Sequence, residues 1–314
     1  MMEYSKIHGY EISKLTLGTV AFGLDYGISN TGAKPAGSDS FTVMSEALNA
    51  GINSLDTARG YGNAEELIGD FLATRKEYKK TTITTKFRIS KEHLISKDRL
   101  YKEVFDSVRA SLRYLKLPKL PFCLFHMPEG LPVEDILKTL PGLLNDLKHE
   151  ALIDVSGVSV YHPDQVEWLI PFREIQALQV PMNLFDNRLI QKGLLKRMAL
   201  ENKAVFIRSV FLQGLFFMDP DQLKGNLTNA APYLVRLREL AATAGMSVAQ
   251  LAFSYIKDRE EVTSIVFGAV TPEQVRQNIH FLRYGRLDEN IKSAIEKEFG
   301  TVPENILMPG SWKY

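Results

Sequence analysis

Four side chains of complementary chemistry follow short apolar runs in the first half of the chain. The segment NSLDTARGYG places Asp56 at the end of one run and Tyr61 five residues later, between two glycines. Lys86 ends the run TITTK, and His126 ends the run PFCLFH. An ammonium beside a phenol lowers the pKa of the phenol, and a carboxylate beside that ammonium keeps it charged. With a neutral imidazole to orient a substrate oxygen, this set could protonate a carbonyl oxygen while hydride reaches the carbonyl carbon.

Each of these residues also has an ordinary structural explanation. An aspartate at the end of a strand usually forms a turn or caps a helix, and a loop tyrosine usually packs against its neighbours. A histidine after FCLF is most often a core residue bonded to the backbone, and a lysine at a strand end is usually solvated. What favours a shared catalytic site is that the four residue types occur in order at the ends of successive runs.

These runs belong to a longer pattern in which short apolar segments alternate with helical periodicity. Eight strands are predicted, at 15–18, 54–56, 82–86, 122–126, 154–159, 175–179, 205–208 and 264–267. Helices are predicted at 38–49, 64–72, 97–115, 143–148 (extended upstream towards 133), 164–169, 189–200, 233–244, 247–257 and 272–281. Strict alternation implies a parallel sheet. Eight units match a closed α/β (β/α)8 TIM barrel better than an open, doubly wound sheet.

Two additions to this barrel are predicted. The segment YSKIHGYEISK, ahead of the first strand, has the pattern of a β-hairpin that closes the bottom of the barrel, and 287–299 has that of an extra C-terminal helix. Residues 1–314 are therefore expected to form a single domain. Long loops follow the first strand, at 22–37, and the seventh strand, at 212–232. Both would lie above the C-terminal ends of the strands, where TIM barrels hold their active sites.

The composition argues against several classes of protein. With 38 basic and 37 acidic residues the net charge is +1, so a nucleic-acid partner is not expected. The N-terminus lacks the apolar region of a signal peptide and no run approaches 18 apolar residues, so we expect a cytoplasmic protein without membrane contact. The single cysteine excludes an internal disulfide, and the six histidines show no metal-ligand spacing. Either a monomer or a small homo-oligomer is compatible with the sequence.

The ordered set of D-T-A-x-x-Y-G, a strand-end lysine and a strand-end histidine resembles the active-site pattern of the aldo-keto reductase superfamily. The resemblance extends from LTLGTVAFG to GAVTPEQVRQN, which is nearly the whole chain. It implies a (β/α)8 barrel that uses a nicotinamide cofactor to reduce an aldehyde or ketone, including sugars and other small polar carbonyl compounds. Asp56, Tyr61, Lys86 and His126 would form the catalytic tetrad, with Tyr61 as the proton donor.

The resemblance also implies where the cofactor would bind, since no G-x-G-x-x-G motif supports a Rossmann site. The nicotinamide would meet polar groups at strand ends, and the pyrophosphate and adenosine would meet the segments RSVFLQGL and FGAVTPEQVRQN. The cofactor-binding residues implied in this way are Thr19, Ser159, Gln179, Arg208, Ser209, Gln213, Gly214, Leu215, Gly268, Thr271, Gln274, Gln277 and Asn278.

Several positions depart from the family pattern. Val160 stands where an asparagine usually helps to hold the carboxamide, and Arg208 where an aromatic residue usually stacks on the nicotinamide. A cation beside that ring would disfavour the oxidised, positively charged cofactor; alternatively, Arg208 could reach an acidic group of the substrate. Strongly NADPH-selective members usually carry Lys or Arg where Val270 and Gln274 stand, and Arg276 is the only nearby basic replacement. NADP(H) is favoured as the family expectation, with NAD(H) as the alternative.

The substrate pocket is expected to be lined by Phe22, Tyr26, Met127 and Phe216, a mixture that suits a small polar carbonyl or a sugar as well as an apolar compound. Two alternatives to a carbonyl reductase remain open. One is an NAD(P)-dependent sugar dehydrogenase, which runs the reaction in reverse. The other is a cofactor-binding regulatory module that hardly turns over, since some barrels of this family type are subunits of larger assemblies. The intact tetrad favours an enzyme.

Overall fold

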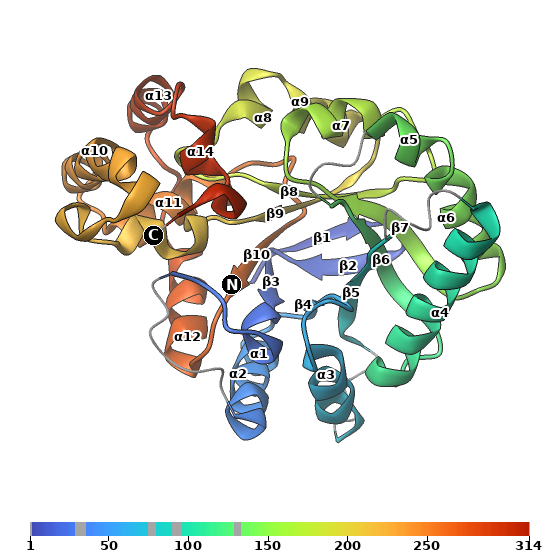
Figure 1. The fold of residues 1–314 in the computed structure, drawn as a ribbon. Helices are drawn as coiled ribbons and strands as arrows, with labels where there is room; N and C mark the ends of the chain where they lie inside the picture. The colour runs from blue at the N-terminus through green and yellow to red at the C-terminus, as the bar shows by residue number, and fades with distance from the viewer. Residues whose placement is uncertain (1, 29–35, 75–79, 90–95, 129–132, 314) are drawn as a thin grey trace.

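A closed barrel of eight parallel strands forms the centre of the protein in the computed structural model, which describes residues 2–28, 36–74, 80–89, 96–128 and 133–313. The strands follow one another around the barrel in chain order, and the last pairs with the first (Figure 1). They are β3 (Leu15–Gly18), β4 (Ser54–Asp56), β5 (Thr82–Phe87), β6 (Leu120–His126), β7 (Ile153–Ser159), β8 (Ala177–Pro181), β9 (Ala204–Arg208) and β10 (Ser264–Gly268). The predicted (β/α)8 barrel is confirmed.

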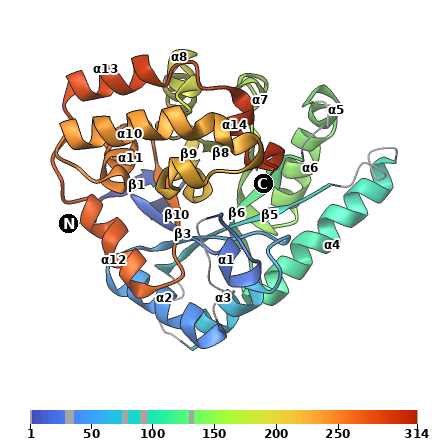
Figure 2. The same ribbon diagram turned by 60° about the vertical axis from the view of Figure 1, so that its left-hand side comes forward.

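Helices surround the barrel on its outside, as two directions of view show (Figure 1, Figure 2). The α-helices are α1 (Val20–Gly23), α2 (Gly37–Asn49), α3 (Ala64–Ala73), α4 (Lys97–Leu115), α5 (Val133–Leu137), α6 (Leu140–His149), α7 (Pro163–Leu169), α8 (Arg188–Gln191), α9 (Leu194–Leu200), α10 (Ala231–Thr243), α11 (Val248–Lys257), α12 (Pro272–Phe281), α13 (Glu289–Glu298) and α14 (Glu304–Leu307). The 3-10 helices are η3 (Leu212–Phe217), η4 (Pro220–Gln222), η5 (Gly225–Ala230) and η6 (Pro309–Ser311). The extra C-terminal helix predicted at 287–299 is α13.

Three predicted elements differ from the structure. The sixth barrel strand was expected at 175–179 but runs from Ala177 to Pro181, so Gln179 lies in its middle. The helix expected at 189–200 is divided into α8 and α9, because Gly193 adopts a left-handed φ of 65° between them. The upstream extension of the helix at 143–148 is the separate helix α5, and α6 begins with Pro141 in its first turn.

An antiparallel hairpin of β1 (Tyr4–Ile7) and β2 (Tyr10–Ser13) lies within the ring of strands, as the sequence predicts (Figure 1). His8 and Gly9 form its two-residue turn, and both have the positive φ that such a turn requires, 49° and 83°. Ile12 of the hairpin is fully buried in a cluster with side chains of four neighbouring strands: Phe122, Leu124, Val155, Ala177, Ala204 and Phe206. The hairpin thus closes one end of the barrel with an apolar plug.

The register of the strands brings the predicted polar residues together at the other end. Asp56 is the last residue of β4, and Lys86 is the penultimate residue of β5. His126 of β6 pairs with Ser159 of β7, which in turn pairs with Gln179 of β8. Because all eight strands run parallel, their carboxyl ends meet at one rim. The loops beyond this rim include the two long loops of the sequence, although residues 29–35 of the first lie outside the described part of the chain.

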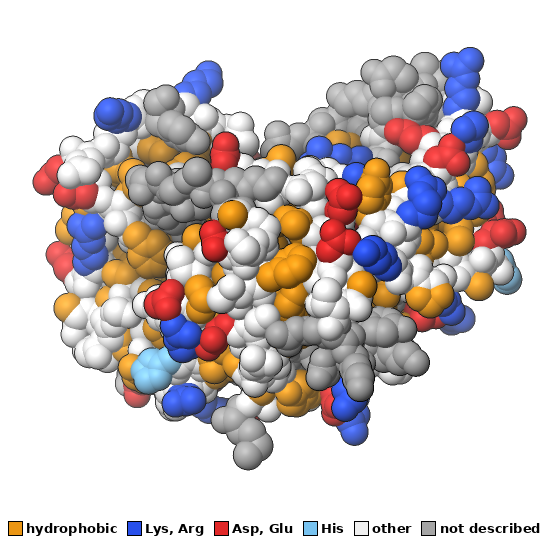
Figure 3. Space-filling view, turned by 90° about the horizontal axis from the view of Figure 1, so that it is seen from below, with side chains coloured by type: hydrophobic (Ala, Val, Ile, Leu, Met, Phe, Trp, Pro, Cys, Tyr) orange, Lys and Arg blue, Asp and Glu red, His pale blue; other side chains and the backbone are white. Residues whose placement is uncertain are grey.

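Lys and Arg are interspersed with Asp and Glu over the face that Figure 3 shows. No helix among the described residues is long and apolar enough to cross a bilayer. The described residues also contain no group of three or more His, Cys, Asp or Glu side chains that could hold a metal ion.

Gly157 of β7 marks a place where the barrel wall leaves no room for a side chain. An added Cβ would overlap the backbone oxygen of Ala177 on β8 and lie 2.6 Å from Cδ2 of Leu124. We expect Gly157→Ala to lower the free energy of unfolding by at least about 2 kcal/mol, because the paired strands must move apart. Urea unfolding measures this loss. The matched control is Gly285→Ala, since no atom lies within 4 Å of its added methyl group; equal stability of the two variants would contradict the prediction.

Candidate active site

A buried ion pair joins the ends of β4 and β5. The Lys86 ammonium donates to both carboxylate oxygens of Asp56, over 2.7 and 2.8 Å, and to the backbone oxygen of Thr57 over 2.8 Å. Lys86 is only 1% exposed and Asp56 only 4%. Burial lowers the pKa of Lys86, and the Asp56 carboxylate opposes this effect. Two contacts to one carboxylate and a third to the backbone fix the direction of the ammonium.

The Asp56 carboxylate receives a further hydrogen bond from Gln179. The Gln179 Nε2 donates to Oδ2 of Asp56 over 2.7 Å, and its Oε1 accepts from Oγ of Ser159 over 3.2 Å. A chain of hydrogen bonds therefore runs from Ser159 through Gln179 and Asp56 to Lys86, across four strands. The sequence resemblance assigns Ser159 and Gln179 to the carboxamide of the cofactor. The structure shows that Gln179 donates directly to the Asp56 carboxylate and that Ser159 donates to Gln179.

Tyr61 lies in a short loop whose backbone contacts the backbone of α1. A Cβ at Gly23 would overlap the backbone oxygen of Tyr61, and a Cβ at Gly62 would overlap the backbone oxygen of Gly23. Gly62 also has a left-handed φ of 56°. Glycine is needed at both positions, because any side chain would push the loop away from α1.

Arg59 anchors the same loop from the side of the barrel. Its backbone N–H donates to the oxygen of Lys86 over 2.9 Å, and its guanidinium forms an ion pair with Glu65. Glu65 is buried, and its second oxygen accepts from Oγ1 of Thr85 over 2.6 Å. The guanidinium also lies 4.4 Å from the centre of the Tyr114 ring. Sequence reasoning did not single out Arg59 or Glu65, although both lie in the segment that carries Tyr61.

Tyr61 does not have the lowered pKa that the sequence analysis expected from Lys86. The Lys86 nitrogen lies 5.1 Å from the centre of the Tyr61 ring, and the Asp56 carboxylate neutralises its charge. Burial raises the pKa of Tyr61 above the ordinary tyrosine value, Asp56 raises it further, and Arg208 opposes both. The phenol therefore stays protonated at neutral pH and has a proton to donate.

His126 is a neutral imidazole in this site. Burial lowers the pKa of His126 to about 2, and the positive charges of Lys86, Arg88 and Arg208 add to this shift. Its Nε2 lies 3.3 Å from Oη of Tyr161, whereas its Nδ1 has no hydrogen-bond partner among the described residues. With the Tyr61 ring edge-on to it at 6.4 Å, His126 lies beside the proton donor but is not itself an acid.

A cavity of about 500 Å³ opens beside Asp56 and Tyr61 at the rim of the barrel. Three of the predicted cofactor residues lie outside its lining: Ser159 is bonded to Gln179, Leu215 is buried in the core, and Thr271 caps α12. The other predicted cofactor residues all line the cavity: Thr19, Gln179, Arg208, Ser209, Gln213, Gly214, Gly268, Gln274, Gln277 and Asn278. The cavity thus brings together segments that are far apart in the sequence.

Two features of this cavity fit a dinucleotide. Oδ1 of Asn278 is buried and accepts no hydrogen bond from the described residues, which leaves an acceptor at the cavity wall for a ligand. Gln213 and Gly214 form a left-handed turn, with φ of 52° and 95°, that presents backbone to the cavity. Gly214 has no side chain there, so a pyrophosphate could approach the backbone closely.

Three of the four residues predicted to line the substrate pocket lie outside the lining of this cavity. Phe22 and Met127 are 0% exposed and Phe216 is 1% exposed, and none of the three lines the cavity. These side chains turn inward and belong to the hydrophobic core; the Phe216 ring, for example, packs on Phe185 at 4.8 Å. Tyr26 does line the cavity. The aromatic residues of the lining are Tyr26, Tyr61, Phe211, Phe217, Phe267 and Phe281.

Tyr161, two residues beyond the end of β7, is a residue of the site that sequence reasoning missed. The guanidinium of Arg208 lies 4.8 Å from the centre of its ring. Arg208 also donates to the backbone oxygen of Val160 over 2.9 Å and to Oγ of Ser209 over 3.1 Å. The Tyr161 ring lies at 13° to the ring of His126. The position of Tyr161 just after a strand end was the only feature of the sequence that indicated a place in this site.

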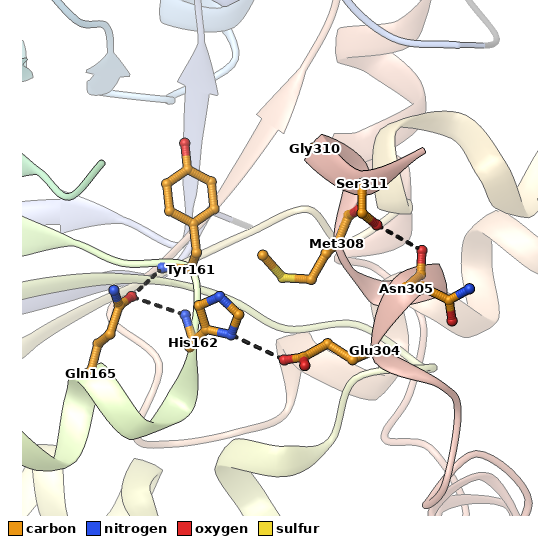
Figure 4. Close-up of a pocket in the computed structure, with 8 residues that line it drawn as sticks. All are labelled: Tyr161, His162, Gln165, Glu304, Asn305, Met308, Gly310 and Ser311. Atoms are coloured by element: carbon orange, nitrogen blue, oxygen red, sulfur yellow. Dashed lines mark hydrogen bonds and ion pairs between the residues drawn. The ribbon is translucent and has the colours of Figure 1, made fainter. Parts of the chain in front are cut away.

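A second cleft, of about 400 Å³, reaches Tyr161 from the C-terminal segment (Figure 4). It is lined by Tyr161, His162, Gln165, Glu304, Asn305, Met308, Gly310 and Ser311. Oε1 of Gln165 accepts from the backbone N–H groups of Tyr161 and His162, over 2.9 and 3.1 Å, and so fixes the start of α7. Glu304 accepts from His162 and from Arg188, which ties the C-terminal segment to the barrel.

Comparison with known proteins identifies one family along most of the chain. The model of the Aldo/keto reductase family matches residues 14–297. The chain is 27% identical over 270 residues to the NADH-specific methylglyoxal reductase of Escherichia coli (strain K12), covering 77% of this chain and 82% of that protein. Its fold is similar to that of an aldo-keto reductase from Bacillus halodurans, with a TM-score of 0.77, 21% identity and coverage of 95% and 96%. A glycerol dehydrogenase from Gluconobacter oxydans is also similar, with a TM-score of 0.74, 22% identity and coverage of 95% of each chain.

The family match runs from the residue before β3 into α13. It therefore includes the whole barrel, the Asp56–Lys86 pair, Tyr61, His126 and both segments that line the larger cavity. A match of this extent shows common family membership and not only a shared barrel, a fold that serves many unrelated functions. The protein belongs to the aldo/keto reductase family and is an oxidoreductase that uses a nicotinamide cofactor.

Proposed function

We propose that the protein reduces a small aldehyde or ketone to an alcohol, with Tyr61 as the proton donor. The observation that carries the proposal is a protonated Tyr61 beside the Asp56–Lys86 pair, on the wall of a cavity whose other residues fit a dinucleotide. Cofactor and substrate can thus be held against the proton donor in one place. The Escherichia coli relative is named for the reduction of methylglyoxal, a small carbonyl compound, which supports this class of substrate.

Each residue of the tetrad has a separate task in this reaction. A bound nicotinamide would supply the hydride. Tyr61 would donate its proton to the carbonyl oxygen as negative charge develops there, and the Lys86 ammonium would stabilise the phenolate left behind. Asp56 keeps Lys86 charged and directed. His126, as a neutral imidazole, can donate one hydrogen bond to the same oxygen without competing as an acid.

We also propose NAD(H), rather than the NADP(H) favoured by the resemblance, as the preferred cofactor. Arg276, the only basic residue in the segment 267–278, forms ion pairs with Glu46, over 3.2 Å, and with Glu273. Arg208 is the only basic side chain among the described residues of the cavity lining, and it lies over Tyr161. At the segment 267–278 a 2′-phosphate would find no basic side chain other than Arg276 and would lie near the carboxylates that pair with it. The name of the Escherichia coli relative, NADH-specific, supports the same choice.

Steady-state assays with aldehydes, ketones, sugars and alcohols test the proposed reaction. We expect carbonyl-dependent oxidation of NADH, and a fall in kcat of about 10²- to 10⁴-fold in Tyr61→Phe, because phenylalanine keeps the ring but has no proton to donate. NADH binding by this variant should be unchanged, which separates lost chemistry from lost folding. Turnover of hydroxyl substrates alone would favour a dehydrogenase, and no turnover of any compound would favour a regulatory module; either result contradicts the proposal.

Fluorescence titration with NADH and NADPH tests the choice of cofactor. NADH is expected to bind at least about tenfold more tightly, a difference of about 1.4 kcal/mol. Val270→Arg should reduce or reverse the preference for NADH over NADPH, because it adds a cation to the cavity wall where NADPH-selective relatives carry one. The matched control is Val235→Arg, which adds the same charge at a position on α10 that is 47% exposed. Equal or tighter binding of NADPH by the unaltered protein would refute the proposed preference.

A further inference from the structure

Tyr161 brings a second phenol to the catalytic centre. Its Oη lies 3.3 Å from Nε2 of His126, and it is close enough to Tyr61 and Lys86 to influence the pKa of each. In Figure 4 its ring points away from the paired side chains of His162 and Glu304. The proposed reaction already has a proton donor in Tyr61, so the hydroxyl of Tyr161 needs a different explanation.

Three contacts hold Tyr161 in a fixed position. Its backbone N–H donates to Oε1 of Gln165 over 2.9 Å. The Arg208 guanidinium covers one face of its ring and is itself bonded to the backbone oxygen of Val160 over 2.9 Å. Its hydroxyl contacts His126. A phenol fixed in this way loses little conformational entropy when a ligand binds, which is the property of a recognition group.

The protonation of His126 determines what the Tyr161 hydroxyl can do. A neutral imidazole carries one hydrogen, on either Nδ1 or Nε2. The Nδ1 atom of His126 is buried without a partner among the described residues, and a buried N–H without an acceptor costs more than a nitrogen lone pair without a donor. The hydrogen is therefore placed on Nε2, which donates towards Oη of Tyr161. The hydroxyl hydrogen of Tyr161 is then directed elsewhere and can be donated to a ligand.

The two donors match a substrate with oxygens on neighbouring carbons. Nε2 of His126 and Oη of Tyr161 are 3.3 Å apart, a spacing comparable to that of two oxygens on adjacent carbon atoms. When a substrate carbonyl oxygen takes its proton from Tyr61 and replaces Oη of Tyr161 as the acceptor of the one N–H of His126, the Tyr161 hydroxyl can donate to an oxygen on the next carbon. A substrate without that oxygen would leave the Tyr161 hydroxyl unused.

We propose that Tyr161 is a specificity-determining residue that hydrogen-bonds a second substrate oxygen, so that the protein prefers 2-oxoaldehydes, 2-hydroxyaldehydes and 2-hydroxyketones. This inference rests on the proposed carbonyl reduction, because the first oxygen is placed by His126 and Tyr61. Tyr161 also lines the second cleft, together with His162 and Met308 (Figure 4).

The test compares Tyr161→Phe with the unaltered protein on substrates that differ only at the neighbouring carbon: propanal, lactaldehyde and methylglyoxal, and butanone against acetoin. The ratio of kcat/KM between the two proteins is taken for each substrate, which cancels the different intrinsic reactivities of the carbonyl groups. For lactaldehyde, methylglyoxal and acetoin we expect kcat/KM of Tyr161→Phe to be about three- to tenfold lower than that of the unaltered protein, because one neutral hydrogen bond is lost. For propanal and butanone the ratio should stay within about twofold of unity.

Tyr255→Phe is the matched control, since it removes a buried phenol whose hydroxyl also makes one contact of 3.3 Å, with Glu296 on the outside of the barrel. It should change no substrate selectively. An equal loss on all substrates in Tyr161→Phe would show that the hydroxyl only orients His126, and no loss on any would show that it has no role; both results overturn the inference. If the unaltered protein reduces none of the carbonyl compounds, the proposed function fails first, and NADH titration shows whether the cofactor site survives.

Discussion

The buried ion pair of Asp56 and Lys86 is the interaction on which the rest of the site depends. Two opposite charges are removed almost completely from water, which costs free energy unless hydrogen bonds compensate for the lost hydration. Gln179 and the backbone of Thr57 supply these bonds. Burial is the main cause of the raised pKa of Tyr61 and of the lowered pKa of His126, and the pair adds to both shifts, because Asp56 raises the pKa of Tyr61 further and Lys86 lowers that of His126 further. Tyr61 is therefore a protonated phenol that can act as an acid, whereas His126 is a neutral imidazole that can donate a hydrogen bond but cannot act as the acid.

Two of the departures from the family pattern, Val160 and Arg208, contact each other in the structure. Arg208 replaces the usual aromatic residue and donates to the backbone of Val160, which replaces the usual asparagine. Its guanidinium covers Tyr161, and Tyr161 reaches His126. Arg208, on the proposed cofactor side of the site, is thus joined through Tyr161 to His126, on the proposed substrate side. This connection explains why we expect a particular substrate class rather than a general carbonyl reductase.

The sequence predicted those parts of the structure that follow from local patterns. Alternating strands and helices predicted the barrel, and ordered strand-end residues predicted which side chains share its rim. It failed where a residue's environment depends on distant neighbours. An apolar side chain after a strand can face the core or a cavity, and residue spacing did not predict that Phe22 and Met127 are buried in the core. Tyr161 becomes significant only through contacts with β6 and β9. The raised pKa of Tyr61 depends on burial, which residue spacing does not describe.

We infer that the Asp56–Lys86 pair serves chemistry rather than stability. The most direct test is the double variant Asp56→Asn/Lys86→Met, in which both charges are removed and neither partner is left buried and unpaired. We predict that its free energy of unfolding stays equal to that of the unaltered protein or rises by about 1–4 kcal/mol, as for other buried pairs replaced together. Its kcat for carbonyl reduction should fall by at least about 10³-fold. A variant that retains turnover within about tenfold, or that unfolds more easily by several kcal/mol, would contradict this account.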